Sequence, residues 1–285
     1  MLIDEACVSC IINQSVKVSD AINADKELQK KLTSTVEDLS REFSYSNTPP
    51  EIASYVYEKM AGIAGKKDLY DEVKALSTKK ALSFIPFLKE KLLKSDNPLL
   101  VATKIAVAGN VIDLAAAVKF DLEEELEKIF ERDFSHNDFF TMASELEKAK
   151  KIVILGDNVG EHIFDYLFIE TLKELYPEKS YSYFVRGTPI INDVTIKEAK
   201  EAGFEELCEL VDSGVNTPGF AYSRANENAK EIFDKADLVI SKGMGNYESL
   251  TPSHRTNICF LLKVKCNVVA GSLGKNVGDI ICKFV

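Results

Sequence analysis

The chain is poor in the residues that build disulfide frameworks and metal-thiolate sites. It has six cysteines and three histidines in 285 residues. The histidines are scattered, and no second Cys-x-x-Cys accompanies Cys7-x-x-Cys10, so a structural zinc site is not indicated. The first residues, Met-Leu-Ile-Asp4-Glu5, lack the basic start and apolar core of a signal peptide. We therefore expect free thiols and a cytoplasmic protein.

Basic charge and long apolar runs are also scarce. With 45 acidic against 35 basic residues, the net charge is −10, which is unlike the basic surface of a nucleic-acid binder. The stretch 101–118 is the most apolar, but it contains Lys104, Asn110 and Asp113. A charge near the centre of a bilayer costs about 2.5 to 3.5 kcal/mol, so this stretch is better explained as a buried helix. We expect neither a nucleic-acid nor a membrane partner; the oligomeric state stays open.

What the chain does contain is a change of pattern along its length. Before about residue 95, apolar residues recur at helical spacing, and Thr48 is placed to cap a helix that begins at Pro49. After about residue 150, strand and helix patterns alternate, which is typical of βαβ units. We predict an all-helical N-terminal region (1–95) and an α/β domain (96–285) with a mostly parallel sheet between flanking helices, a Rossmann-like three-layer arrangement. The expected strands are 151–156, 181–186, 237–241, 258–262 and 280–284.

Polar side chains follow two of these strands where each strand ends. Asp157 and Asn158 come directly after the first, and Asp193 follows the second after a short loop. Ligands of open α/β sheets bind beyond the carboxyl ends of the strands, so these side chains are expected to converge. Hard oxygen ligands favour a divalent cation. The alternative is that they are ordinary turn formers and helix caps.

Two further segments place cations near the same edge. Lys242-Gly243-Met-Gly245-Asn246-Tyr247-Glu248 follows the third strand, and its glycines allow backbone amides to approach a ligand closely. This segment is neither a Walker loop nor a complete dinucleotide fingerprint, and a hairpin or helix cap is the alternative. Lys265 follows the next strand and can reach the same crevice, unless it is simply a solvated lysine. No Gly-x-Ser-x-Gly elbow is present, which weakens a serine hydrolase interpretation.

Two residue pairs within predicted helices have spacings that place both side chains on one helix face. Asn110 and Asp113 lie three residues apart in an apolar helix, where an unpaired buried polar group costs about 1 to 3 kcal/mol. A cleft or a neighbouring helix end can supply those partners. Cys7 and Cys10 are also spaced to face one side of a helix, as packed thiols or with a redox or metal role.

Taken in order, these motifs resemble the metal-dependent damage-control phosphatases, formerly classed as domain of unknown function 89. The resemblance spans nearly the whole chain, because Cys7-x-x-Cys10 and Asp68-Leu-Tyr70 are similar to features of the stand-alone prokaryotic branch of that family. One departure is Leu69, which stands where a proline is usual. The motifs that carry the resemblance are 109–113, 156–161, 186–193, 242–248 and 265–266.

The resemblance implies a cation site and a set of substrate contacts. A Mn, Co, Ni or Mg ion would be held by Asp157, Asn158 and Asp193, and Lys265 would contact the phosphate. Asp157, Asp193 and Lys265 are the expected catalytic residues. The expected substrate-binding residues are Asn110, Asp113, Glu161, Arg186, Lys242, Gly243, Asn246 and Glu248.

These features lead to one main functional hypothesis and two alternatives. The main hypothesis is a metal-dependent phosphatase that hydrolyses phosphomonoesters of small metabolites, such as sugar phosphates or damaged phosphometabolites. A carboxyl methyltransferase that uses S-adenosylmethionine is the enzymatic alternative, since acidic residues and a glycine-rich segment beyond parallel strands also suit that cofactor. A non-catalytic metal- or nucleotide-binding protein is the other.

Overall fold

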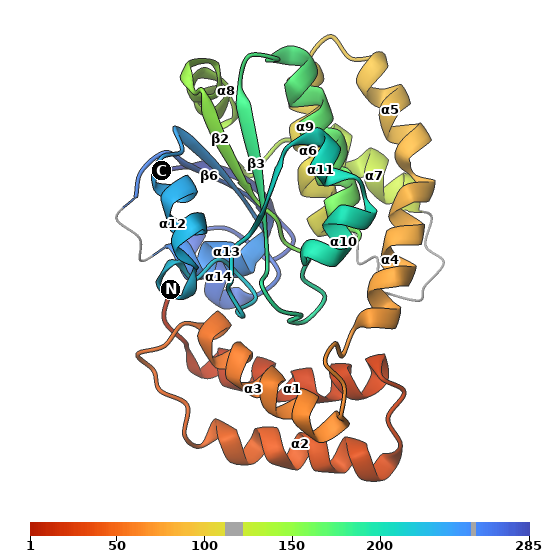
Figure 1. Ribbon diagram of the computed structural model, residues 1–285, viewed down its shortest axis with the longest axis vertical. Helices are drawn as coiled ribbons and strands as arrows, with labels where there is room; N and C mark the ends of the chain where they lie inside the picture. The colour runs from red at the N-terminus through yellow and green to blue at the C-terminus, as the bar shows by residue number, and fades with distance from the viewer. Residues whose placement is uncertain (112–121, 252–254) are drawn as a thin grey trace.

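The structure, a computed structural model, describes residues 1–111, 122–251 and 255–285. It confirms an α/β fold whose N-terminal part is helical (Figure 1). No described helix is both long enough and apolar enough to cross a lipid bilayer. The helices that precede the central strand are α1 (Glu5–Ala21), α2 (Lys26–Ser40), α3 (Pro49–Ala64), α4 (Asp71–Ser83), α5 (Ile85–Leu93), α6 (Pro98–Val111), α7 (Leu122–Glu131) and α8 (Phe139–Lys148).

A seven-stranded sheet has the spatial order β1-β7-β6-β5-β2-β3-β4. Strands β6, β5, β2, β3 and β4 run parallel, whereas β7 is antiparallel to β6 and β1 runs with β7. The mostly parallel sheet predicted from the sequence is thus confirmed. The strands are β1 (His136–Asn137), β2 (Lys151–Leu155), β3 (Ser180–Val185), β4 (Glu209–Asp212), β5 (Leu238–Lys242), β6 (Ile258–Lys263) and β7 (Ile280–Phe284).

The sheet lies between two layers of helices, because alternate residues of each strand face opposite sides. In β2, Ile152 and Ile154 pack into a core shared with α6 and α9, whereas Val153 and Leu155 pack into a second core with α12, α13 and α14. Figure 1 shows α6 and α9 on one side of the sheet and the last three helices on the other. The helices after β2 are α9 (Glu161–Leu175), α10 (Ile196–Glu201), α11 (Phe204–Leu207), α12 (Glu227–Asp234), α13 (Gly243–Leu250) and α14 (Asn267–Leu273).

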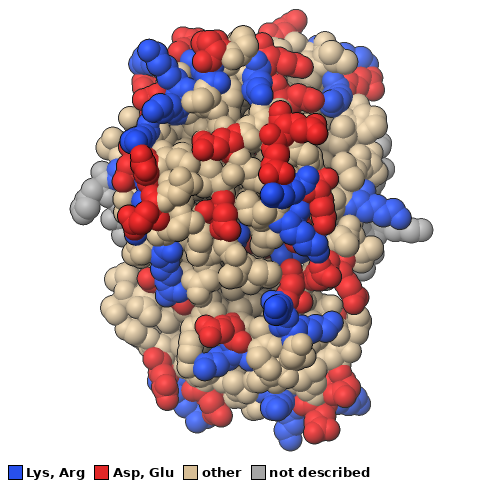
Figure 2. All heavy atoms as spheres, in the orientation of Figure 1, with Lys and Arg blue, Asp and Glu red and all other residues tan. Residues whose placement is uncertain are grey.

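Helices α1, α2 and α3 enclose a third core, which includes the fully buried Leu32, Val36 and Met60. The start of α3 is as predicted: Thr48 and Glu51 form a reciprocal capping box around Pro49. Helix α3 contacts α13, and Ile190 from the loop after β3 joins this third core. The N-terminal helices therefore cover the edge of the sheet where the parallel strands end. On the face in Figure 2, acidic and basic side chains are interspersed.

Some local predictions were wrong. The two short strands β1 and β4 were not predicted. Residues 222–235 form a 3-10 turn (Tyr222–Arg224) followed by α12. Cys7 is buried and Cys10 is exposed, although their spacing predicts a shared helix face. All six cysteines are free, as expected.

Candidate active site

The strand order reverses between β2 and β5, and two of the predicted site segments meet there. After β2 the chain adds β3 and β4 on one side, then returns to place β5 and β6 on the other. Such a switch point is where open α/β sheets bind ligands. Asp157 follows β2 and Gly243 follows β5, and a Cβ atom on Gly243 would lie only 1.9 Å from Asp157 Oδ2. The two strand ends are therefore in direct contact.

The loop after β3 brings Asp193 to the same place. It pairs in antiparallel fashion with the segment after β2: Val194 N–H donates to Asp157 O at 2.9 Å, and Val159 N–H donates to Asn192 O at 2.8 Å. This pairing makes Asn158 and Asp193 direct neighbours across a β-bridge. Asp157, Asn158 and Asp193, which the sequence analysis assigns to a cation, are thus gathered at one point.

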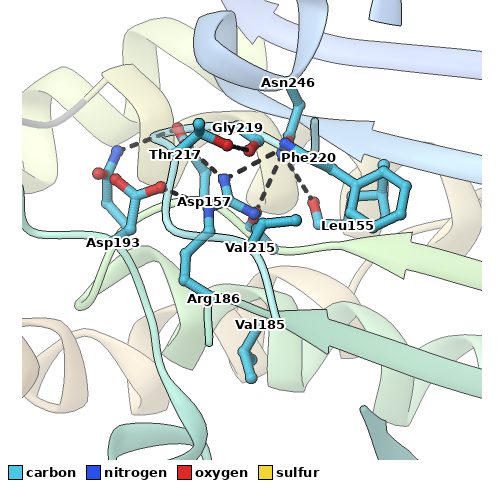
Figure 3. Close-up of polar contacts among 12 residues, drawn as sticks. Leu155, Asp157, Val185, Arg186, Asp193, Val215, Thr217, Gly219, Phe220 and Asn246 are labelled. Atoms are coloured by element: carbon cyan, nitrogen blue, oxygen red, sulfur yellow. Dashed lines mark hydrogen bonds and ion pairs between the residues drawn. The ribbon is translucent and has the colours of Figure 1, made fainter. Parts of the chain in front are cut away.

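Arg186 lies behind these carboxylates and is 1% exposed. Its Nε donates to Asp193 Oδ2 at 2.7 Å, and a terminal nitrogen lies 3.8 Å from Asp157 Oδ1 (Figure 3). The same nitrogen donates to Asn246 Oδ1 at 3.3 Å. Because it holds both aspartates from the protein side, Arg186 is placed to align the predicted cation ligands rather than to face solvent.

Asn246 is a fully buried junction between three chain segments. Its Nδ2 donates to Gly156 O at 3.0 Å and to Lys242 O at 2.7 Å, and its Oδ1 accepts from Phe220 N–H at 2.7 Å. The side chain thereby ties together the ends of β2 and β5 and the loop at Phe220 (Figure 3). Asn246 is predicted from the sequence to contact the substrate, whereas its side chain lies beneath the site in the structure.

Glu161 and Lys242 complete the buried part of the site. Asn158 Nδ2 donates to Glu161 Oε1 at 2.8 Å and to Asp157 Oδ2 at 3.0 Å. Lys242, which has no exposed surface, forms an ion pair with Asp165 of α9. Asp165 was missed by the sequence analysis. The signal available in the sequence was an acidic residue among the apolar positions of the segment that forms α9, one turn after Glu161.

The other predicted residues lie at the margin. Lys265 is exposed, and its charge acts to lower the pKa of Glu161, so it lies near the acidic group. Glu248 is partly exposed, and burial raises its pKa to about 7. Asp113 and the side chain of Asn110 lie outside the described residues. Gly109, just before Asn110, packs so closely on Glu161 that a Cβ atom there would lie 3.0 Å from Glu161 Cβ.

Burial and the neighbouring charge of Asp157 raise the pKa of two carboxyl groups of the site, Glu161 and Asp193. Burial, followed by the charge of Asp157, raises the pKa of Glu161 to about 7. The pKa of Asp193 is also raised to about 7 by burial, against the opposing charge of Arg186. A bound cation reverses this effect, since it favours the ionised forms. The acidic cluster, formed by Asp157, Glu161 and Asp193, therefore carries more negative charge than its buried surroundings stabilise.

The predicted ligand set fits a hard divalent cation in its chemistry. Two carboxylates and one carboxamide offer oxygen donors and leave coordination positions open. In this structure the nitrogen of the Asn158 carboxamide faces Asp157 and Glu161, and a half-turn of that group presents its oxygen instead. Within residues 1–111, 122–251 and 255–285, no group of three or more His, Cys, Asp or Glu side chains is arranged to hold a metal. A cation held by Asp157 and Asp193 would therefore also need the Asn158 carboxamide as a ligand.

A cavity of about 380 Å³ lies between the N-terminal helices and the loop after β3. Its wall includes Ile190, whose carbonyl accepts from Asp193 N–H at 3.0 Å, so the cavity and the acidic cluster share one loop. Tyr57 and Leu69 supply apolar surface, and Ser54, Glu58, Lys67, Asp68, Thr188 and Asn216 supply polar groups.

His162, next to Glu161, gives a prediction about pH. Burial lowers the pKa of this histidine to about 4, below its ordinary value of 6.5, so the folded chain keeps it neutral while the unfolded chain protonates it. The contribution of neutral His162 to the free energy of unfolding is therefore fully present above pH 6.5. It is lost as the pH falls towards 4, by about 1.4 kcal/mol per pH unit in this window. Urea unfolding of wild type and His162→Gln between pH 7 and 4.5 should show a stability difference that shrinks with acidity. A constant difference would contradict the assignment.

Nearly the whole chain is similar to known proteins. Residues 3–281 match the model of a family described as the damage-control phosphatase ARMT1-like domain. A damage-control phosphatase of Pyrococcus horikoshii, PH1575, is 32% identical over 99% of this chain and 98% of its own. A damage-control phosphatase of Archaeoglobus fulgidus is 30% identical over the full length of both chains. The crystal structure of the Pyrococcus horikoshii protein, described as a DUF89 family protein, superimposes with a TM-score of 0.92 over 100% of this chain and 99% of that chain.

Proposed function

The chain belongs to the damage-control phosphatase ARMT1-like family, and from this membership we propose that it is a metal-dependent phosphatase acting on phosphomonoesters of small metabolites. The observation that carries the proposal is the meeting of Asp157, Asn158 and Asp193 at the switch point between β2 and β5. Two carboxylates and a carboxamide at such a point suit a divalent cation that also has to bind a phosphate oxygen.

In this proposal each side chain has a distinct task. Asp157, Asn158 and Asp193 would hold a Mn, Co, Ni or Mg ion, which when bound supplies Lewis acidity and orients a water molecule. Arg186 keeps Asp157 and Asp193 aligned through its contacts at 3.8 and 2.7 Å. The amide groups at the start of α13 face the same edge, where the helix end carries a partial positive charge.

Lys265 is the exposed cation of the proposed mechanism. Its exposed side chain is free of the constraint that fixes Lys242, and it lies close enough to affect the pKa of Glu161. Lys265 would contact a non-bridging phosphate oxygen and neutralise charge that develops there in the transition state.

The organic part of the substrate would occupy the cavity beside the acidic cluster. A volume of about 380 Å³ is within the range of small-molecule sites, and the wall combines an aromatic ring, Tyr57, with carboxylate, hydroxyl and amide groups. Such a wall suits a polyhydroxylated metabolite, for example a sugar phosphate, because ring C–H groups pack on apolar surface while hydroxyls find polar partners.

A phosphatase screen tests the proposed function. Chelator-treated protein should release no phosphate from p-nitrophenyl phosphate or from sugar phosphates until Mn, Co, Ni or Mg is added. Calcium is a useful control, because its larger radius and higher coordination number suit this three-residue set poorly. Activity that survives exhaustive chelation, with methyl groups appearing on an acceptor, would instead indicate the methyltransferase. Cation binding without turnover of any phosphoester would indicate a non-catalytic binding protein.

A further inference from the structure

A second buried charge pair lies directly beneath the candidate site. Lys242 donates to Asp165 Oδ1, and the hydroxyl of Tyr183 donates to Asp165 Oδ2 at 3.0 Å. All three side chains are fully buried. Both carboxylate oxygens of Asp165 are therefore engaged, one by an ammonium group and one by a hydroxyl group.

Lys242 lies beside the predicted cation site through both its main chain and its side chain. Its main chain leads into Gly243, which touches Asp157, and its side chain ends at Asp165, one helical turn beyond Glu161 on α9. Burial acts to lower the pKa of Lys242, but the charges of Asp165, Glu161 and Asp157, in that order, outweigh it and raise the pKa. After Asp165, the acidic groups that act most strongly on this ammonium are thus the ones beside the cation site.

We propose that Asp165, oriented by Tyr183, is a positioning residue that holds the ammonium group of Lys242 away from the predicted cation ligand Asp157 and from Glu161 beside it, so that Asp157 can serve a cation. This inference rests on the proposed function, because it concerns the same site. It assigns roles to Asp165 and Tyr183, which lie outside the predicted ligand set.

The physical reason is competition for the same oxygens. A buried ammonium without a partner is strongly disfavoured, so Lys242 without Asp165 would turn to other carboxylates of the site. Glu161 lies one helical turn before Asp165 on α9, and the carboxylate of Asp157 lies against Gly243, the residue after Lys242. An ammonium paired there would occupy the oxygens and the negative charge that a divalent cation needs. Asp165 prevents this self-inhibition by offering a better partner one turn away.

Mn²⁺ binding by the full chain, measured by calorimetry and by the loss of the free-ion electron paramagnetic resonance signal, tests the inference. Asp165→Asn should weaken the Kd for Mn²⁺ by about tenfold or more, the scale on which residues that orient metal ligands act. The double variant Asp165→Asn/Lys242→Met removes the displaced ammonium as well, and its Kd should return close to that of the wild type. Recovery in the double variant distinguishes competition from general damage to the site.

Two outcomes would overturn the inference: a wild-type Kd in Asp165→Asn, or a double variant as weak as the single one. Should Asp165→Asn fail to fold, Tyr183→Phe provides the same test in milder form. Its ring can keep the stacking on Phe204, at 4.2 Å between centroids, while Asp165 loses one donor. A smaller weakening of Mn²⁺ binding is expected from it, and an unchanged Kd would overturn the inference.

The inference and the proposed function fail in different ways. A chain that shows the predicted pattern of Kd values but hydrolyses no phosphomonoester would support the role of Asp165 and contradict the phosphatase. An active, cation-dependent phosphatase whose Mn²⁺ affinity ignores Asp165 would overturn the inference alone.

Discussion

Replacing Asp157 by asparagine should lower kcat/KM for phosphomonoesters by about 10²- to 10³-fold, the loss typical of removing one preorganised electrostatic group. The substitution keeps the shape of the side chain but removes its charge. Asp157 lies where β2 and β5 meet, beside Gly243 and within 3.8 Å of Arg186, so an isosteric amide has room to occupy the same place. Cation affinity should fall together with activity.

The same substitution, Asp157→Asn, should not lower the thermal stability of the chain without metal. The charge of Asp157 raises the pKa of both Glu161 and Asp193, so its removal relieves repulsion in a chain without added metal. We expect the Tm of Asp157→Asn in chelator to equal or exceed that of the wild type. Asp38→Asn, an exposed residue of α2 paired with Arg41, is the matched control and should leave the rate unchanged. Near-normal activity of Asp157→Asn would contradict the site.

Gly243→Ala adds one methyl group at the site, and we expect it to lower both activity and stability strongly. The residue has φ = +77°, and its new Cβ would lie 1.9 Å from Asp157 Oδ2. The left-handed conformation alone costs a non-glycine residue about 1 to 2 kcal/mol, and the clash adds to it. Because the clash is with the carboxylate itself, activity should be lost even at temperatures where the variant remains folded. Urea unfolding and phosphate release measure the two effects.

Gly62→Ala provides the matched control. Gly62 lies within α3, and a Cβ atom there would meet nothing within 4 Å. Alanine should therefore stabilise the helix by about 0.5 to 1 kcal/mol without changing the rate. If Gly243→Ala behaved like Gly62→Ala, the close approach of β5 to Asp157 would be wrong.

Much of the fold could be predicted from sequence because its strands are buried on both faces. β2 and β6 are nearly continuous runs of apolar residues, and β3 and β5 are mostly apolar or aromatic with buried serines among them. The two strands that were missed, β1 and β4, are short and lie at the edges of the sheet, where fewer side chains are buried and the apolar signal is weak. Helix α13 was hidden by its two glycines, which are needed where the chain approaches Asp157 and Pro218 closely.

The convergence of the site segments could be predicted from the sequence, but the contacts between their side chains could not. Parallel strands place their carboxyl ends at one edge, so the convergence of Asp157 and Asp193 follows from the strand pattern. The partner of the buried Lys242 side chain does not follow from the strand pattern, because Lys242 and Asp165 are 77 residues apart and no local spacing links them. Arg186 and Lys242 also show that a cation near a predicted site can serve to hold carboxylates in place.

Crystals of the chelator-treated chain soaked in Mn²⁺ would test the central claim most directly. We predict one strong anomalous difference peak at the switch point between β2 and β5, within coordination distance of Asp157, Asn158 and Asp193, with the Asn158 oxygen turned towards it. Inorganic phosphate added to the soak should bind the same ion on the side of Lys265. An anomalous peak elsewhere, or none in a protein that still hydrolyses phosphomonoesters, would contradict the account.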